Sequence, residues 1–169
     1  GGEAHLPAAM RWHAIPIVQL HAAAFWLYGQ TEDARANAAT HLHGCETLAM
    51  NPRERALHRA LTLWHANDNL RAVETLEAIT AEWPRDLFSA KLAEFLYYLL
   101  GQQFMGARFR AHMNRLRPMH ADDPDFLAMA AFAGELCDDF AAAEAGANRA
   151  LDLEPRNPWA QHALTHVLI

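Results

Sequence analysis

The segment LRAVETLEAITAEWP, residues 70–84, decides the fold of this chain. Its side chains Ala72, Leu76 and Ile79 recur at the i, i+4, i+7 spacing that marks one face of an α-helix. Pro84 ends that helix, because proline fits the first turn of a helix but not its interior. The segment and the polar turn 67–69 before it therefore predict the second helix of a helix pair.

This pattern of two helices and a proline recurs along the chain. The prolines that close the predicted pairs are Pro52, Pro84, Pro118 and Pro155, at separations of 32, 34 and 37 residues. A period near 34 residues is typical of the tetratricopeptide repeat. The predicted pairs cover approximately residues 10–52, 53–84, 85–118 and 124–155, followed by a truncated helix at 158–169. We therefore predict an all-α fold, a single helical-repeat domain over residues 1–169 in which the hairpins stack as a right-handed superhelical α-solenoid. We also expect the chain to be part of a longer protein.

Composition excludes several classes of partner. The 169 residues carry 20 acidic and 14 basic side chains, for a formal net charge of −6, whereas nucleic-acid-binding domains are usually basic. Arginine outnumbers lysine 13 to 1. No run of about 18 apolar residues is present, so we expect no membrane span. The two cysteines, Cys45 and Cys137, cannot form a disulfide framework and favour a cytoplasmic location.

Six segments carry a more specific signal. They are PRERA at 52–56, EWPRDL at 82–87, LYYLLG at 96–101, AFAGELCDDF at 131–140, ALDLEPR at 150–156 and WAQHALTHVL at 159–168. From about Met10 onward the chain resembles the tetratricopeptide repeat protein 38 family, which implies an all-helical repeat fold and no established reaction. The chain departs from the family pattern at Ile169, at Glu94-Phe95 in place of a His-Asp pair, and at the turn near Asp138, which lacks a glycine.

The resemblance to tetratricopeptide repeats implies a concave groove lined by the first helix of each pair. The groove residues expected on that basis are Trp64, His65, Lys91, Phe95, Tyr98, Phe132, Glu135, Trp159, His162 and His166. An aromatic groove with scattered polar groups can bind an extended or helical peptide. The alternative is that many of these aromatic side chains pack between helices, since Trp and Tyr are often largely buried.

Two groups of residues resemble metal-ligand sets. His162 and His166 share one helix face, but zinc requires a third ligand and no glutamate lies between them. The stretch 41–46 contains His41, His43, Cys45 and Glu46. On a helix, His41 and Cys45 share a face while His43 points away. We therefore expect no metal and no cofactor, with His162 and His166 as the remaining candidates.

Two features lie outside the expected groove. Arg108, His112 and Arg115 fall on one helix face, which indicates either a docking site for an acidic segment or a solvated outer face. Residues 119–123 lengthen one linker, and we expect them to loosen that repeat junction.

Three functions are compatible with these patterns. The first is a protein-interaction scaffold that binds a peptide or partner protein in the groove. The second is a hydrolase of small amides or esters, with a histidine-containing groove completed by further repeats. The third is a structural subunit of a larger assembly, in which a partner chain or a second copy of this chain covers the apolar end 167–169. No glycine-rich phosphate loop, Gly-x-Ser-x-Gly elbow or Cys-x-x-Cys pair is present, which removes the common nucleotide, serine-hydrolase and redox interpretations.

Overall fold

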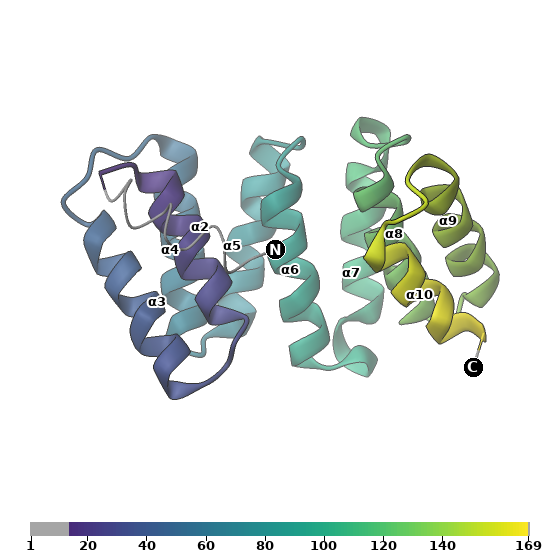
Figure 1. Ribbon diagram of the computed structural model, residues 1–169, viewed down its shortest axis with the longest axis horizontal. Helices are drawn as coiled ribbons and strands as arrows, with labels where there is room; N and C mark the ends of the chain where they lie inside the picture. Colours follow the sequence, from purple (N-terminus) through teal and green to yellow (C-terminus); the bar gives the residue numbers. More distant parts are fainter. Residues whose placement is uncertain (1–13, 169) are drawn as a thin grey trace. The chain divides into compact units, whose positions relative to one another are not determined.

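The computed structural model describes residues 14–168, and all regular secondary structure within that range is helical (Figure 1). The elements are α2 (Pro16–Leu27), α3 (Glu32–Cys45), α4 (Pro52–His65), α5 (Asn69–Glu82), α6 (Leu87–Leu100), α7 (Gln102–Leu116), the 3-10 turn η2 (Arg117–Met119), α8 (Pro124–Glu135), α9 (Phe140–Leu153) and α10 (Pro158–Leu168). The prediction of an all-α fold is confirmed. None of the helices described is long and apolar enough to cross a membrane.

The helices begin where short polar side chains can cap them. Asn51 precedes α4 and forms a capping box with Glu54, in which each side chain accepts a hydrogen bond from the other residue's backbone N–H, at 2.9 and 2.8 Å. The side chains of Asp123 and Asp139 accept hydrogen bonds from the first backbone N–H groups of α8 and α9. Pro52 opens α4, so it starts a helix pair here rather than closing the preceding one.

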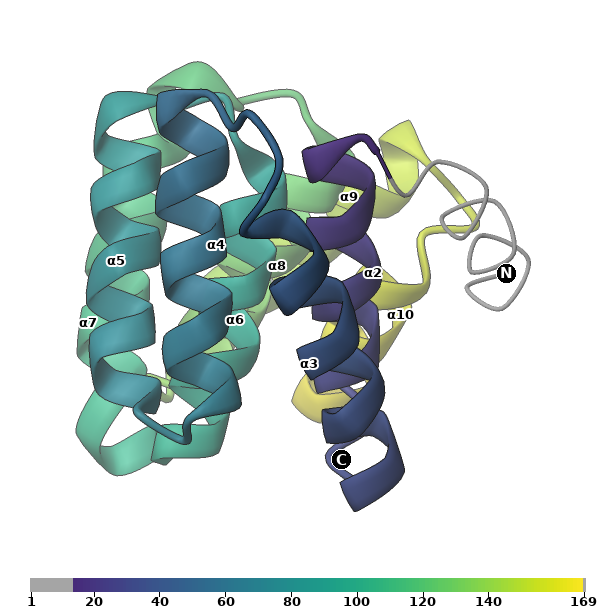
Figure 2. The same cartoon turned by 90° about the vertical axis from the view of Figure 1, so that its left-hand side faces the viewer.

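The chain divides into two compact units, Gly1–Ile79 and Thr80–Ile169, which are described separately. In unit 1, α2 packs against α3 and α4, and α3 packs against α4. Figure 2 shows α2 and α3 side by side, with α4 beside α5. The interior of unit 1 is built from fully buried aliphatic side chains, including Leu20, Ala38, Leu57 and Leu61.

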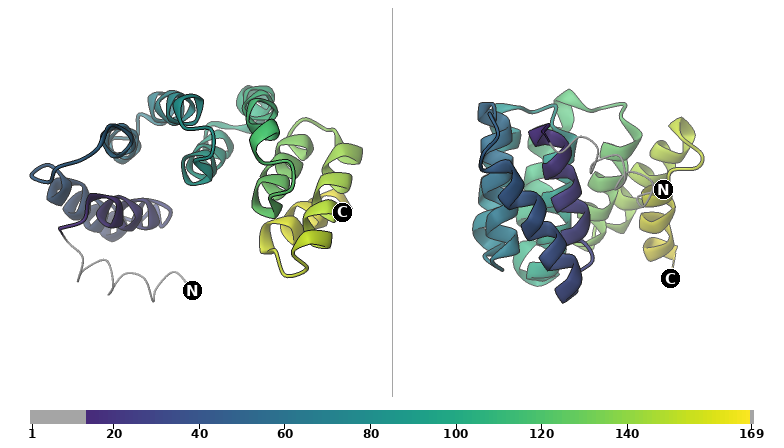
Figure 3. Two further views of the ribbon diagram at one scale, coloured as in Figure 1. Left: turned by 90° about the horizontal axis from the view of Figure 1, so that it is seen from above. Right: turned by 60° about the vertical axis from the view of Figure 1, so that its left-hand side comes forward.

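In unit 2, each helix from α6 to α10 packs against the next. The first helices of successive pairs also meet, because α8 contacts both α6 and α10. The green and yellow helices α8, α9 and α10 form one packed group (Figure 3). Small side chains allow this close approach: Ala131, Ala147 and Ala163 form one buried cluster between the three helices. Neighbour packing of this kind is what a helical repeat requires.

A buried hydrogen-bond network lies between α5, α6 and α7. His112 on α7 is 1% exposed, and its two ring nitrogens lie 2.7 Å from Thr80 Oγ1 and 3.0 Å from Tyr97 Oη. Tyr97 also stacks on Phe109, with ring centroids 5.1 Å apart. The interpretation that placed His112 on an exposed basic face is therefore wrong, because its imidazole connects two hydroxyls in the core of unit 2. We refer to Thr80, Tyr97 and His112 as the His112 network.

The linker before α8 is held by specific contacts. His120 is 7% exposed, its Nε2 lies 2.7 Å from the carbonyl oxygen of Pro84, and its ring stacks on Phe126 at 5.4 Å. Asp122 forms an ion pair with Arg149 of α9 at 3.2 Å. The expectation that the additional residues loosen this junction is therefore wrong, since they include the buried histidine that attaches it.

Candidate functional site

Seven of the expected groove residues come together on one face of unit 2. They belong to the first helices of three pairs, α6, α8 and α10, in which α8 contacts both of the others. We call them the α6–α8–α10 cluster: Lys91 and Tyr98 from α6, Phe132 and Glu135 from α8, and Trp159, His162 and His166 from α10.

Phe132 is the centre of the aromatic part of this cluster. Its ring centroid lies 6.3 Å from that of Tyr98, 6.2 Å from that of His162 and 6.3 Å from that of His166. Trp159 meets His162 edge-on at 5.9 Å. Phe132 is half-buried, whereas Tyr98 is 57% exposed and Trp159 is 48% exposed. The cluster therefore presents large aromatic surfaces to solvent.

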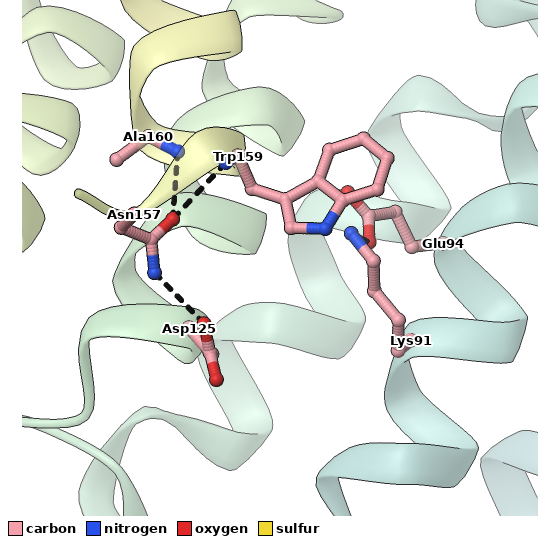
Figure 4. Close-up of polar contacts among 6 residues, drawn as sticks. All are labelled: Lys91, Glu94, Asp125, Asn157, Trp159 and Ala160. Carbon is pink, nitrogen blue, oxygen red and sulfur yellow. Dashed lines mark hydrogen bonds and ion pairs between the residues drawn. The ribbon is translucent and has the colours of Figure 1, made fainter. Parts of the chain in front are cut away.

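Lys91 and Glu94 form an ion pair beneath Trp159 (Figure 4). The ammonium nitrogen of Lys91 lies 3.4 Å from the centroid of the indole ring, a cation–π contact. The side chain of Glu94 is only 5% exposed. Burial lowers the pKa of Lys91, although the charges of Glu94 and Asp125 oppose this effect. Burial also raises the pKa of Glu94, against the effect of Lys91. Burial therefore disfavours the charged form of each group, and the attraction between the two charges opposes this effect.

Beside the ion pair lies a pocket of about 250 Å³, which we call the Lys91 pocket. Its lining residues are Leu87, Phe88, Lys91, Asp125, Met129 and Trp159. Four of the six are apolar, so one amine and one carboxylate face an otherwise hydrophobic space. That composition is typical of a small ligand site or of an anchor pocket for a peptide side chain.

Asn157 positions Trp159 at the start of α10. Its side-chain oxygen accepts hydrogen bonds from the backbone N–H groups of Trp159 and Ala160, at 3.1 and 2.9 Å, and thereby caps the helix (Figure 4). Its side-chain amide donates to Asp125 of α8 at 2.8 Å. Asn157 itself is fully buried. Sequence reasoning missed this residue, although an asparagine directly before Pro158 is a recognisable N-cap signal.

The histidines lie at the other end of the cluster. The rings of His162 and His166 are 4.5 Å apart, and His166 Nδ1 lies 3.6 Å from Glu135 Oε1. Burial lowers the pKa of His162, and the neighbouring His166 and Lys91 lower it further, while Glu135 opposes them. Among the described residues, no group of three or more His, Cys, Asp and Glu side chains could hold a metal ion.

The remaining predicted groove residues lie elsewhere. Trp64 belongs to unit 1, where it is 4% exposed and packs edge-on against Tyr28 at 5.4 Å, as the packing alternative expects. His65 follows it in α4 and is half-buried, and its carbonyl oxygen accepts a hydrogen bond from the Arg35 guanidinium. Phe95 is half-buried on α6.

The sequence cluster at 41–46 separates into unrelated contacts. His41 Nδ1 lies 2.7 Å from Gln19 Oε1, while His43 pairs with Glu46 at 3.1 Å on the surface. Cys45 is fully buried, and burial, assisted by the charge of Glu54, raises the pKa of its thiol to about 11. A thiol of that pKa is protonated at neutral pH, so Cys45 is a packing residue.

No protein-family model matches this chain, and no solved structure matches it significantly. The resemblance to the tetratricopeptide repeat protein 38 family stays a prediction from sequence.

Proposed function

We propose that this chain is a tetratricopeptide-like interaction scaffold and that the α6–α8–α10 cluster binds a peptide or helix of a partner protein. The observation that carries the proposal is the exposure of two large aromatic side chains, Tyr98 at 57% beside Phe132 and Trp159 at 48% beside His162. Partly exposed aromatic residues are common anchors of a protein interface. The adjacent Lys91 pocket can take one large side chain of the ligand.

The repeat assignment rests on packing in unit 2. There the first helices α6, α8 and α10 follow one another in direct contact, as stacked hairpins do. The right-handed superhelix is part of this proposal. A cytoplasmic location is also part of it, supported by the free thiols of Cys45 and Cys137.

A selection of random linear peptides against the chain tests the proposal. Peptides enriched on the wild type should bind Trp159→Ala about thirtyfold more weakly, the loss expected when an aromatic anchor is truncated. The matched control is Phe104→Ala, which removes a 74% exposed aromatic ring of α7 outside the cluster. It should change affinity less than about twofold. Equal losses in the two variants, or none in Trp159→Ala, would contradict the proposal.

One observation favours a second candidate, a hydrolase of small amides or esters. Glu135 lies beside His166, and a carboxylate next to an imidazole can orient a general base. Hydrolysis of p-nitrophenyl acetate should then fall to the background rate in His166→Gln. The control is His43→Gln, since His43 is also paired with a glutamate but lies on the surface of unit 1. If both variants lose activity equally, the reaction is unspecific imidazole catalysis.

A further inference from the structure

The use of lysine in this chain is unusual. Among 14 basic side chains there is a single lysine, Lys91, and every other one is arginine. Arginine stays charged at any accessible pH, whereas lysine can lose its proton when it is buried. The single lysine is partly buried in the cluster, with a side chain that is 25% exposed. A function that requires loss of the side-chain proton would explain why this position holds lysine and not arginine.

The surroundings of Lys91 are those of an amine nucleophile. It lines the Lys91 pocket of about 250 Å³, whose other walls include Phe88, Met129 and Trp159. Its ammonium group pairs with the buried Glu94, which lies beside the pocket and is close enough to exchange a proton with it, while Asp125 lies in the pocket wall. Enzymes activate lysines for attack on carbonyl carbons by placing them in hydrophobic pockets beside a group that moves protons.

Burial disfavours the charged form of both Lys91 and Glu94. It lowers the pKa of Lys91 and raises the pKa of Glu94. Transfer of one proton from the ammonium to the carboxylate gives a neutral amine beside a carboxylic acid, and desolvation favours that state. The neutral amine is the form that attacks a carbonyl group.

We propose that Lys91 forms an imine with a small apolar or aromatic aldehyde bound in the Lys91 pocket, and that Glu94 carries the protons of this reaction. The inference does not depend on peptide binding by the cluster. Its basis is the geometry of one amine, one buried carboxyl group and an aromatic pocket.

The reaction needs no oxidant or further reactant. The lone pair of Lys91 Nζ forms a bond to the aldehyde carbon, and the carbonyl oxygen takes the proton held by Glu94. The positively charged nitrogen returns a proton to the Glu94 carboxylate, which leaves a neutral carbinolamine. Glu94 then protonates the hydroxyl group, water leaves, and the nitrogen lone pair forms the C=N bond. The product is a protonated imine beside the Glu94 carboxylate, so the original contacts of a cation with Glu94 and Trp159 are preserved.

Reductive trapping tests this proposal. The full chain is incubated with benzaldehyde and sodium cyanoborohydride at neutral pH, and peptide mass spectrometry measures the benzyl adduct on Lys91 separately from the α-amino group. The reference is the same chain unfolded in urea. We expect labelling of Lys91 to be about tenfold or more faster in the folded chain. Equal or slower labelling in the folded chain would overturn the proposal, whereas the peptide selection decides the scaffold function independently.

Two variants test whether Glu94 transfers protons in the reaction or whether burial of Lys91 alone explains its reactivity. Glu94→Gln should slow labelling about tenfold or more, because the amide cannot exchange the proton. Asp125→Asn should accelerate labelling about twofold, since the charge of Asp125 stabilises the Lys91 ammonium and its removal lowers the pKa of Lys91 further. If Glu94→Gln does not fold, the Asp125→Asn variant, whose substitution is at an exposed position, provides the test. An unchanged or slower rate of Lys91 labelling in Asp125→Asn would overturn the proposal.

Discussion

Tyr97 and Tyr98 are neighbours in the sequence and belong to opposite parts of unit 2. Tyr97 is fully buried in the His112 network, whereas Tyr98 is 57% exposed in the α6–α8–α10 cluster. One residue along a helix turns a side chain by about 100°, which is enough to move it from the interior to the surface. The comparison shows that the same pair of residue types, tyrosine and histidine, forms a structural network on one side of α6 and a candidate binding surface on the other.

The two regions differ in how their polar atoms are satisfied. Both ring nitrogens of His112 have protein partners, because a buried polar group without one is costly. His162 and His166 contact aromatic rings and keep access to solvent, and His166 also faces Glu135 at 3.6 Å. We therefore expect substitutions in the His112 network to lower stability, and substitutions in the cluster to affect binding.

The largest effect is expected for His112→Ala. It creates a cavity and leaves the hydroxyls of Thr80 and Tyr97 without their imidazole partner, so the free energy of unfolding should fall by about 4 kcal/mol. Tyr98→Ala should lower it by less than about 1 kcal/mol, since that ring is mostly in solvent. Urea denaturation followed by circular dichroism measures both. Similar losses in the two variants would mean that the two regions do not differ as proposed.

Asn157→Ala is expected to have the next largest effect. The substitution removes the cap of α10 and the bond to Asp125, and should lower the free energy of unfolding by about 2 to 3 kcal/mol. Because Trp159 follows the cap directly, binding of a selected peptide should weaken in the same variant. Asn114→Ala, on the exposed face of α7, is the matched control and should stay within about 0.5 kcal/mol of the wild type. A harmless Asn157→Ala would show that the cap does not position the cluster.

A pair of glycines sharpens the contrast between packed and open sites. A Cβ on Gly106 of α7 would lie 2.7 Å from the backbone oxygen of Leu136, so Gly106→Ala should cost about 2 kcal/mol. A Cβ on Gly44 of α3 meets nothing within 4 Å, and Gly44→Ala should stabilise the chain by about 0.5 kcal/mol through helix propensity. Thermal unfolding measures the two shifts, and the prediction is wrong if they have the same sign.

The smallest effect concerns the pH dependence at His162. Its pKa in the folded chain is lowered from the ordinary value of 6.5, so the unfolded chain binds more protons below that pH. The contribution of neutral His162 to the free energy of unfolding is therefore complete above pH 6.5, and it is lost as the pH falls through the lowered pKa. His162→Gln should reduce the loss of stability between about pH 7 and pH 5 by less than about 0.5 kcal/mol, because solvent screens the exposed ring.

An NMR titration provides the direct readout of the same effect. The imidazole signals of His162 should titrate with a midpoint below 6.5 in the wild type. In His166→Gln the midpoint should rise, because the charge of His166 disfavours protonation of His162. A midpoint at or above 6.5 in the wild type would contradict the description of the cluster.

The sequence by itself determined the helices and much of the cluster. Apolar spacing, caps and prolines are local signals, so they placed α4 to α10 within a few residues. The seven side chains that meet on one face were expected from the resemblance to tetratricopeptide repeats. Only the tertiary structure decided which of the helical positions are interior. The sequence patterns around Trp64 and His112 are equally compatible with a buried and with an exposed side chain. No periodic pattern predicts the partners of Glu94 and Asn157, which are Lys91 and Asp125. The partners of His112 and Asn157 lie on other helices, and burial and hydrogen bonding between helices depend on packing that no local pattern encodes.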